Sequence, residues 1–467
     1  MCMAACIRAG MASASAAEVT MTADVLPPAA LGSIAPSGSG TTNAPYVYAF
    51  STANGLDMAS YSIRNNELAD KNVLLDLNGG SITSTAVSGR YGCTNFSFRS
   101  TADTYRSSLT ITNVNNIRIG KVWTYGSYVN SSVPRAAGNV LIGNNAAGKR
   151  AGRVEISEIL TYGSGAFGIT PPGIINIYGT NDVLIWDGVA RGNIERWVAG
   201  GSGYYEPNWD LIIWHDGAFL AGYVDNSAYE SARVPSSVNF NGDILGDGAS
   251  GSFQACSISN TVYYLTTAGS VLISNYTSVA IGVIDTHYDK TNPQDDNRGG
   301  GGAVTITNIA GSIVIGAIRT YTTGQQGYYD AGNISISSSG GDITVTDVLD
   351  LHATNRYASG GILMLSATKA NAVITLPDLD LTKMNCAAVS PGSKCIVKGD
   401  LIGFSTNTAS QTQLRMPAGK RMFYYPDRTN NAYLARGRYL LADTSGVSTN
   451  GGVLMPYVSP GTVITLK

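Results

Sequence analysis

The sequence is poor in charged side chains. Asp, Glu, Lys and Arg together make up 13% of its 467 residues, about half the usual fraction for a soluble domain. The formal net charge is −2 and no basic stripe is present, which argues against a nucleic-acid partner. Its polar surface must come from Ser, Thr and Asn, and these residues, with 55 Gly and 26 Tyr, suit pleated strands and tight turns better than solvated helices.

The sequence also lacks long apolar runs. None reaches the roughly 18 residues that a membrane-spanning helix needs, so no transmembrane segment is predicted. The hydrophobic content of 44% nevertheless provides for a substantial core and excludes a disordered chain. Residues 1–18 are small and apolar, and Ala12-Ser13-Ala14 resembles the small-x-small site of a secretory signal. We therefore predict a shortened signal peptide at 1–18.

Cysteine is scarce, and its spacing excludes common cysteine sites. Among the six Cys no Cys-x-x-Cys pair occurs, which argues against a zinc or thioredoxin-type site. Cys386 and Cys395 are separated by a short loop that contains Pro391 and Gly392. This spacing predicts a local disulfide in an oxidising compartment.

One pattern recurs along the chain: aliphatic, any residue, aliphatic, two spacers, aliphatic, any residue, and then usually Thr or Asp. The first two aliphatics alternate with period two, which is typical of a strand, and the spacers mark a corner. Six segments carry the pattern, beginning at Ile117, Val154, Val279, Ile313, Ile343 and Ile374.

A second apolar strand usually precedes each segment, often just after Gly. Another Gly often separates the two strands, and the last three complete units are spaced about 30 residues apart. The preceding strands begin at Leu109, Val140, Ile175, Val304, Ile334 and Leu363, and degenerate copies begin at Val73 and Val183.

These units predict an all-β fold, a right-handed parallel β-helix (β-solenoid) with three short strands per coil. One unit cannot bury its apolar side alone, whereas units stacked about 4.8 Å apart pair each strand with its copies and form a continuous core. The alternative is an antiparallel β-sandwich, which is expected to show turn signals about every 8–12 residues without a shared register.

The predicted organisation has four parts. Residues 1–18 are the signal peptide, 19–60 an N-terminal segment and cap, 61–413 the β-helix, and 414–467 a C-terminal β cap. Caps are expected because terminal coils expose unpaired strand edges. Between 190 and 262 the repeat pattern is lost, and enlarged loops are predicted there.

The most regular repeats resemble a known family. GGAVTITNIAGSIVIGAIRTYTTG and GNISISSSGGDITVTDVLDLHATN are similar to repeats of filamentous-haemagglutinin-type and autotransporter-type surface proteins of bacteria. The resemblance covers residues 299–382 well and 108–190 fairly. It implies an exported β-helix, secreted or on the bacterial cell surface, that serves as an adhesin or a structural protein.

The positions of the three His give little indication of a catalytic site. His287 falls on the repeat position of Tyr125, Tyr162 and Tyr321, and His352 lies close to it, which predicts rings in a stacked column. His215 follows Trp214 and precedes Asp216, and a His beside an Asp could perform acid–base work. No nucleophile in a recognisable context accompanies this pair.

Carboxylates leave an enzymatic alternative open. Many parallel β-helices cleave polysaccharides, and the hydrolases need two carboxylates that converge on a groove. The sequence does not show whether the Asp residues between 187 and 247 converge or merely serve in surface turns. In the enzymatic reading the catalytic candidates are Asp187, Asp210, His215 and Asp216, with Asp225, Asp243 and Asp247 as further carboxylates.

Two binding sites are predicted. Asp289, Asp295 and Asp296 lie in a polar loop and offer the hard oxygen ligands that Ca²⁺ accepts at flexible spacing. Flat aromatic faces stack on sugar rings, and Tyr and Trp add a polar group. The candidate glycan-binding residues are Tyr204, Tyr205, Trp209 and Trp214.

Two functions follow from the sequence. The first is an exported, non-catalytic structural or adhesive β-solenoid that binds glycans through aromatic loops. The second is a carbohydrate-active enzyme, a polysaccharide lyase or glycoside hydrolase. Converging carboxylates in an aromatic-lined groove would favour the enzyme, and a smooth Ser/Thr/Asn face would favour the structural protein.

Overall fold

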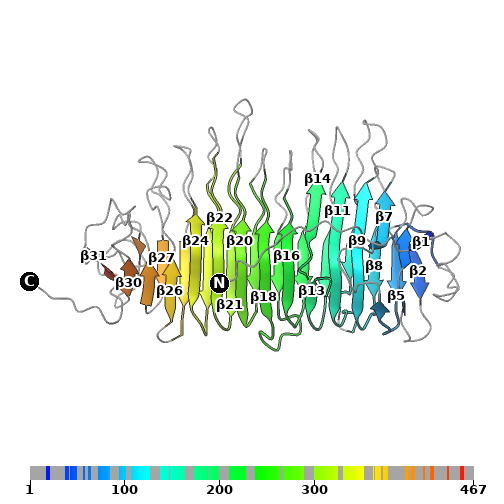
Figure 1. The fold of residues 1–467 in the computed structure, drawn as a ribbon, viewed down its shortest axis with the longest axis horizontal. Helices are drawn as coiled ribbons and strands as arrows, with labels where there is room; N and C mark the ends of the chain where they lie inside the picture. Colours follow the sequence, from blue (N-terminus) through cyan, green and yellow to red (C-terminus); the bar gives the residue numbers. More distant parts are fainter. Residues whose placement is uncertain are drawn as a thin grey trace, which may run out of the picture. The chain divides into compact units, whose positions relative to one another are not determined.

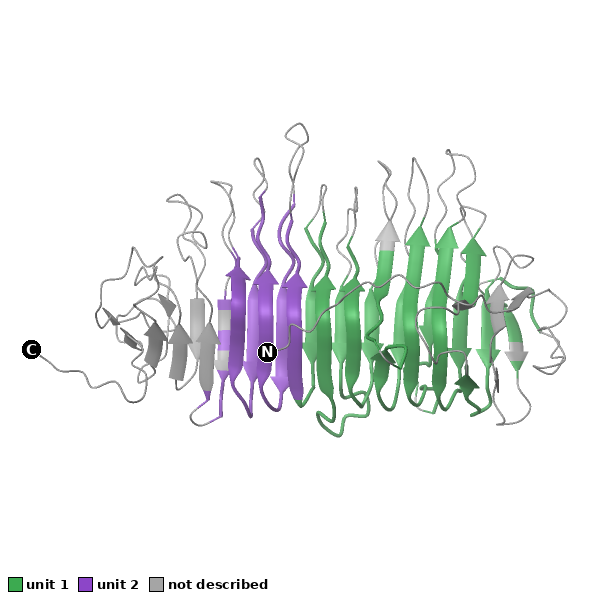
Figure 2. Ribbon diagram, viewed as in Figure 1, with its two compact units in different colours: residues 1–277 green, residues 278–467 purple. Residues whose placement is uncertain are grey.

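The computed structural model forms two compact units, residues 1–277 and 278–467 (Figure 2), each of which is described by itself. The residues that the structure describes are 17–20, 37–41, 43–49, 56–57, 61–64, 72–84, 94–100, 107–126, 137–146, 148–163, 173–188, 190–198, 210–227, 237–262, 267–288, 299–323, 330–351, 361, 363–369, 372–376, 395–398, 401–404, 414–415, 421–424, 439–440 and 453–456.

The protein is an all-β parallel β-solenoid, as the repeats predict. Within the described residues there is no helix, and the strands pair in parallel (Figure 1), except that β31 (Tyr439–Leu440) runs antiparallel to β32 (Val453–Pro456). The antiparallel sandwich is therefore wrong. The right-handed coil and the three strands per coil stay predictions.

In residues 1–277 the strands form two stacks, here called the wide sheet and the narrow sheet. The wide sheet contains β1 (Ala17–Thr20), β3 (Leu56–Asp57), β4 (Tyr61–Arg64), β6 (Ile82–Thr83), β7 (Thr94–Ser100), β9 (Ile117–Gly126), β11 (Val154–Gly163), β13 (Val183–Ile185), β14 (Ile194–Val198), β16 (Phe219–Asp225) and β18 (Ser252–Ser259). The narrow sheet contains β2 (Tyr46–Ala49), β5 (Val73–Asp76), β8 (Leu109–Thr112), β10 (Val140–Ile142), β12 (Ile175–Tyr178), β15 (Leu211–Trp214), β17 (Val238–Asn241) and β19 (Val271–Ser274).

Residues 278–467 repeat this arrangement with shorter described stretches. Ile313 pairs with both Val279 and Ile343, as the repeat alignment predicts. Parallel stacking also continues from β28 (Leu401–Phe404) to β30 (Arg421–Tyr424) and β32, of which the last two lie inside the segment predicted as a cap. The cap itself stays a prediction. The wide sheet contains β20 (Ser278–Asp285), β22 (Ile313–Arg319), β24 (Ile343–Asp350), β26 (Val373–Leu376), β28 (Leu401–Phe404), β30 (Arg421–Tyr424), β31 and β32, and the narrow sheet β21 (Val304–Ile309), β23 (Ile334–Ser338), β25 (Leu363–Ala367), β27 (Cys395–Lys398) and β29 (Leu414–Arg415).

The core consists of aliphatic columns that run from coil to coil. Along the narrow sheet of residues 1–277, Leu109 pairs with Val140, and Val140 with Ile175. All three side chains are fully buried. Their neighbours Thr110, Leu141 and Asn176 face outward and are partly exposed. The alternation predicted from period two is therefore the alternation between core and surface.

The coils continue in the described residues 190–198, 210–227 and 237–262, within the segment where the repeat pattern is predicted to be lost. Leu211 pairs with Val238, and Phe219 pairs with Phe253. Phe219, Phe240 and Phe253 fill the core, with ring centroids 4.8 to 5.0 Å apart. The prediction of lost register was wrong because aromatic rings replace the aliphatic residues that define the pattern elsewhere.

A buried hydrogen bond to a Gly carbonyl explains the Thr that ends three of the repeats, whereas the hydroxyl of Thr161 is buried with no partner among the described residues. In residues 278–467 the Oγ1 of Thr286 donates to the carbonyl of Gly302, and that of Thr320 to the carbonyl of Gly332, each at 2.7 Å. In the other unit Thr124 does the same with Gly138 at 2.7 Å. A Cβ on Gly138 would lie 1.7 Å from a backbone oxygen of the preceding coil, so only Gly fits there.

Candidate functional site

The outward surface of the wide sheet in residues 1–277 carries a group of polar and aromatic side chains. Strands β9, β11, β14, β16 and β18 lie side by side there (Figure 1). Because successive coils are in register, residues at one repeat position form a line across these strands. One line is Trp123, Leu160, Glu195, Asp225 and Ser259. Two residues further along the strands, Tyr125 pairs with Tyr162, and Ser227 bonds to Thr261.

Aromatic rings occupy the first coils of this surface. Trp123 and Tyr125 stack with their centroids 4.5 Å apart and an interplanar angle of 29°. Tyr125 pairs in register with Tyr162 of the next coil. Trp123 Nε1 is buried and has no hydrogen-bond partner among the described residues. Three partly exposed aromatic side chains therefore lie together on the adjacent strands β9 and β11.

A carboxylate is held directly beside this aromatic line. The Tyr162 hydroxyl donates to Glu195 Oε2 at 2.8 Å, and Asn193 Nδ2 donates to Glu195 Oε1 at 3.0 Å. Each carboxylate oxygen thus accepts a hydrogen bond from a neutral donor. Such bonds to a charged acceptor are stronger than those between neutral groups, so Glu195 is fixed in place next to the phenol.

A second carboxylate follows in the next coil. Asp225 pairs in register with Glu195, and the Ser227 backbone N–H donates to its Oδ1 at 3.0 Å. Burial raises the pKa of the Asp225 carboxyl, hydrogen bonds from Ser227 oppose this, and the charge of Glu195 raises it further. Two half-buried carboxylates therefore lie on adjacent strands, and the charge of Glu195 disfavours ionisation of Asp225.

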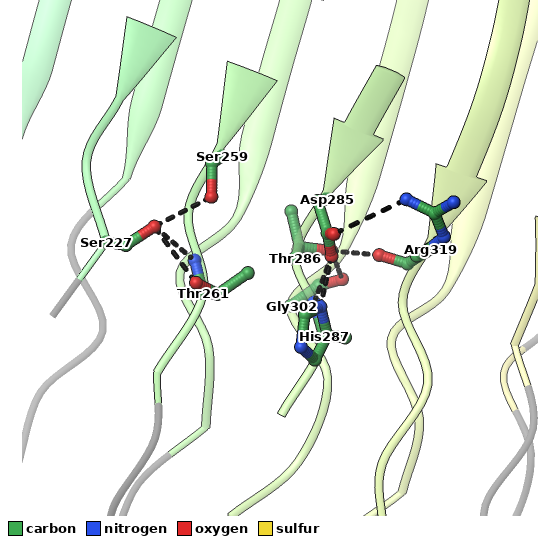
Figure 3. A network of polar contacts seen from close by, with 8 residues as sticks. All are labelled: Ser227, Ser259, Thr261, Asp285, Thr286, His287, Gly302 and Arg319. Carbon is green, nitrogen blue, oxygen red and sulfur yellow. Dashed lines mark hydrogen bonds and ion pairs between the residues drawn. The ribbon is translucent and has the colours of Figure 1, made fainter. Parts of the chain in front are cut away.

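Hydroxyl groups continue the line beyond Asp225. Ser227 Oγ lies 2.7 Å from Ser259 Oγ, and Thr261 Oγ1 donates to Ser227 Oγ at 2.9 Å (Figure 3). We call the outward surface formed by Trp123, Tyr125, Tyr162, Glu195, Asp225 and Ser227 the platform face. It combines stacked rings, two carboxylates and a hydroxyl within four neighbouring strands, β9, β11, β14 and β16.

A buried arginine supports the platform face from inside. Arg196 occupies the position of Thr124 and Thr161, and its Nε donates to the carbonyl of Gly173 at 2.9 Å. Its Nη1 donates to Asn226 Oδ1, and Asn226 Nδ2 reaches Asn260 Oδ1 at 3.1 Å. Burial lowers the pKa of Arg196 to about 9, although the charge of Asp210 acts in the opposite direction.

The catalytic candidates named from the sequence serve in turns. Asp187 is buried, and its Oδ1 accepts the Ala190 N–H at 2.7 Å. Asp210 Oδ1 accepts the backbone N–H and the hydroxyl of Ser237 at 2.9 and 2.7 Å. These bonds close turns and join coils, which is a common use of Asp.

His215 and Asp216 do not form an acid–base pair. His215 is fully buried, its Nδ1 accepts the Gly217 N–H at 3.2 Å, and its Nε2 lies 3.0 Å from the Tyr276 hydroxyl. Burial lowers the pKa of His215 to about 3, so the ring is neutral and Nε2 carries its proton. Asp216 Oδ1 instead accepts the Leu245 N–H at 3.3 Å. The imidazole is a core residue, and its burial is the reason that this interpretation of the His–Asp sequence does not hold.

Asp216 belongs to an acidic group that could hold a metal ion. Carboxylate oxygens of Asp216, Asp243 and Asp247 lie within 4.8 Å of one another. Burial raises the pKa of Asp216, and the charges of Asp247 and Asp243 raise it further, against the effect of the Leu245 N–H. Hard oxygen ligands at this spacing suit Ca²⁺, although Asp243 Oδ1 also accepts the Gly246 N–H at 2.7 Å.

The remaining predicted residues are divided between the narrow sheet and segments outside the description. Trp214 lies on β15 of the narrow sheet, packs edge-on against Tyr178 with centroids 5.9 Å apart, and donates from Nε1 to Asn239 Oδ1 at 3.3 Å. It is not part of the platform face. The predicted glycan-binding residues Tyr204, Tyr205 and Trp209 lie outside the described residues, and so do the predicted calcium ligands Asp289, Asp295 and Asp296. His352 and Cys386 also lie outside them. Cys395 is described in its backbone only, at the start of β27.

His287, in the other unit, is a stacked ring as predicted. It lies parallel to Tyr321, with centroids 4.6 Å apart and an interplanar angle of 12°. Its Nδ1 contacts Asp285 Oδ1, and Asp285 Oδ2 lies 3.7 Å from Arg319 (Figure 3). The aromatic repeat position thus recurs in residues 278–467 beside a carboxylate and a guanidinium.

No protein-family model, no curated protein and no solved structure matches this chain. Within the part of the chain that the structure describes, no helix is long and apolar enough to cross a membrane.

Sequence reasoning missed the central part of this site. Glu195 was not among the candidates, because it lies where the repeat pattern fades. Trp123, Tyr125 and Tyr162 were assigned to repeat positions without a binding role. The alignment of the repeats could have predicted this cluster, because outward aromatic residues at the same repeat position of successive coils lie on adjacent strands.

Proposed function

We propose that the protein is an exported, non-catalytic structural or adhesive β-solenoid of the bacterial cell surface that binds polysaccharide on the platform face. One observation carries the proposal: stacked Trp123 and Tyr125 continue in register into Tyr162, beside hydrogen-bonded Glu195. Flat rings beside fixed polar groups are the arrangement that recognises sugars by stacking and hydrogen bonding.

The export and surface location rest on the signal-like residues 1–18 and on the repeat resemblance. The platform face supports the adhesive part of the proposal, because a line of rings along successive coils suits a long polymer better than a compact ligand. No nucleic-acid partner is proposed, in keeping with the net charge of −2.

Binding to a glycan array, combined with a polysaccharide cleavage screen, tests this function. The full chain should retain polysaccharide without releasing new sugar ends, and Tyr125→Ala with Tyr162→Ala should weaken retention roughly tenfold or more. Tyr178→Ala on the narrow sheet is the matched control and should bind like wild type. Equal retention by wild type and the double variant would contradict the proposal.

A second candidate function is glycoside hydrolysis, favoured by the carboxylates of Glu195 and Asp225 on adjacent strands. A protonated carboxyl beside an ionised one is the acid–base arrangement of these enzymes, and Asp225, with its raised pKa, would be the acid. Release of sugar ends by wild type, abolished in Asp225→Asn, would establish this function in place of the first.

Calcium at Asp289, Asp295 and Asp296 stays part of the proposal as a structural ligand. Millimolar calcium should then raise the Tm of wild type and leave that of an Asp295→Asn, Asp296→Asn variant unchanged. Asp243→Asn is the parallel variant for the group around Asp216, and loss of the calcium effect there would assign the ion to that group instead.

A further inference from the structure

We propose that Asn78 is a modification site, at which the side-chain amide deamidates spontaneously to a carboxylate while the protein is folded. Two Asn-Gly sequences lie within the described residues, Asn78-Gly79 and Asn241-Gly242. The structure exposes the first to this reaction and protects the second. The inference is independent of the proposed polysaccharide binding.

The reaction requires the backbone nitrogen that follows the Asn. Gly79 N forms a bond to Asn78 Cγ, the proton of this nitrogen passes to solvent, and the bond from Cγ to Nδ2 breaks with loss of ammonia. Water then opens the five-membered imide at either of its carbonyls, which leaves aspartate or isoaspartate at this position. A following Gly favours the attack because it has no Cβ to hinder the approach, and Asn is among the residues that limit thermal durability.

Asn78 and Gly79 are the central residues of an exposed turn between β5 and β6. Their φ angles are 49° and 81°, and the Gly80 N–H donates to the Leu77 carbonyl at 2.7 Å. Two central residues with positive φ and this closing bond form a type I′ turn, for which Asn-Gly is a preferred sequence. The turn therefore places an Asn-Gly sequence at the surface, where both residues are exposed.

Few contacts hold the reacting groups of this turn. The Asn78 backbone N–H donates to Asp76 Oδ1 at 3.1 Å, but its side-chain amide forms no hydrogen bond within the described residues. A Cβ added to Gly79 would meet no heavy atom within 4 Å. The Gly79 N–H donates to the Asn113 carbonyl at 2.7 Å, so opening of this surface turn releases the nitrogen to attack the amide.

Asn241 has the same following residue in a different environment. Its Oδ1 accepts the Asn275 Nδ2–H at 2.8 Å and the Asp243 backbone N–H at 3.0 Å. Gly242 is buried, its N–H donates to the Ser274 carbonyl at 3.0 Å, and a Cβ there would lie 2.5 Å from the Asn275 backbone oxygen. Attack at Asn241 therefore requires that the side-chain bonds break and that packed coils separate, which raises the free energy of opening.

The product should disturb the coil that contains it. A new carboxylate lies close to Asp76, whose Oδ1 also accepts the Asn113 Nδ2–H at 3.2 Å, and the two negative charges repel each other. Isoaspartate also lengthens the main chain by a methylene group. It therefore disrupts the turn that is closed between Gly80 and the fully buried Leu77.

Peptide mapping by mass spectrometry tests the inference on the full chain incubated in warm, mildly alkaline buffer. The fraction of each Asn-Gly peptide that gains the mass of deamidation gives the rate at that site. Asn78 should react roughly tenfold or more faster than Asn241 in the folded chain. In denaturant the two rates should become similar, because both Asn residues are then unprotected and precede Gly.

Two variants examine the cause and the consequence. Asn275→Gly keeps a left-handed backbone but removes the donor to Asn241, and should raise the rate at Asn241 while leaving that at Asn78 unchanged. Asn78→Gly cannot deamidate and should keep its Tm during an incubation that lowers the Tm of wild type.

Equal rates at Asn78 and Asn241 in the folded chain overturn the inference. So does an Asn78 peptide that stays unmodified in the folded chain but reacts in denaturant. Both results come from wild type alone, so the test does not depend on folding of the variants. Neither result bears on polysaccharide binding, because Asn78 and Asn241 do not belong to the platform face.

Discussion

Tyr162 and Glu195, which are 33 residues apart in sequence, are joined by a hydrogen bond of 2.8 Å between adjacent coils. The bond links the aromatic line of the platform face to its carboxylates. It depends on the register between β11 and β14, in which Tyr162 lies opposite Trp197. The hydrogen bond between Tyr162 and Glu195 can therefore form only if these two coils are in register at the proposed binding surface.

Removing this phenol should weaken the fold measurably. Tyr162→Phe deletes the donor to Glu195 Oε2, and a hydrogen bond to a charged group contributes about 1.5–3 kcal/mol. Part of that is regained from solvent because the pair is half-buried, so we expect a loss of about 1 kcal/mol in urea unfolding at neutral pH. Tyr125→Phe, whose hydroxyl has no such bond in the described residues, should show no change. An equal effect of both substitutions would contradict this role.

The buried His215 should make stability depend on pH. Burial lowers its pKa from the ordinary value of 6.5 to about 3. Between these values the unfolded chain binds a proton that the folded chain does not. The free energy of unfolding should therefore fall as pH drops below about 6.5, by up to about 1.4 kcal/mol per pH unit.

Two measurements check this pH dependence. Urea unfolding between pH 7 and 4 should show a shallower decline in His215→Gln than in wild type. In NMR spectra of the wild type, the His215 ring signals should stay those of the neutral imidazole down to about pH 4. A ring that protonates near pH 6 in the folded protein would show that it is not buried as described.

The buried Thr column should contribute to stability through its carbonyl partners. Thr320→Val keeps the shape of the side chain but leaves the carbonyl of Gly332 without the 2.7 Å bond. An unpaired buried polar group costs about 1–3 kcal/mol, and chemical denaturation should show a loss of that size. Thr305→Val, at an outward position of β21, should change stability by less than about 0.5 kcal/mol. Comparable losses in both variants would refute the assignment.

Arg196 and Asn226 should act as one unit. Arg196→Met leaves Gly173 O and Asn226 Oδ1 without their donor, and should cost about 2–5 kcal/mol. In a double-mutant cycle with Asn226→Ala, the coupling energy should lie between about 0.5 and 3 kcal/mol. Additive effects would mean that the two side chains stabilise the coils independently.

The fold could be predicted from sequence because stacking repeats the same requirement in each coil. Val154, Ile313 and Ile343 each needed an aliphatic neighbour above and below, and the aligned pattern showed this directly. The coils between residues 210 and 262 could not be recognised from this pattern, because Phe219, Phe240 and Phe253 fill the core positions there with rings. A search for aliphatic residues does not detect the replacement of aliphatic side chains by rings, although the rings still fill the core.

The site was harder to predict because it depends on side chains that face outward from different coils. Asp187 and Asp210 drew attention as isolated carboxylates, yet their oxygens are used by turn N–H groups and Ser237. Glu195 and Asp225 are 30 positions apart, and only the pairing of β14 with β16 places them on adjacent strands. His215 illustrates the opposite case, in which proximity in sequence to Asp216 carried no contact in space.

Hydrogen–deuterium exchange of the full chain, alone and with a saturating amount of a polysaccharide that it retains in the glycan-array test, tests the central claim most directly. The account predicts slower backbone exchange in β9, β11, β14 and β16, and no change in the narrow sheet around Tyr178 and Trp214. Protection confined to the narrow sheet, or no protection anywhere, would contradict polysaccharide binding on the platform face.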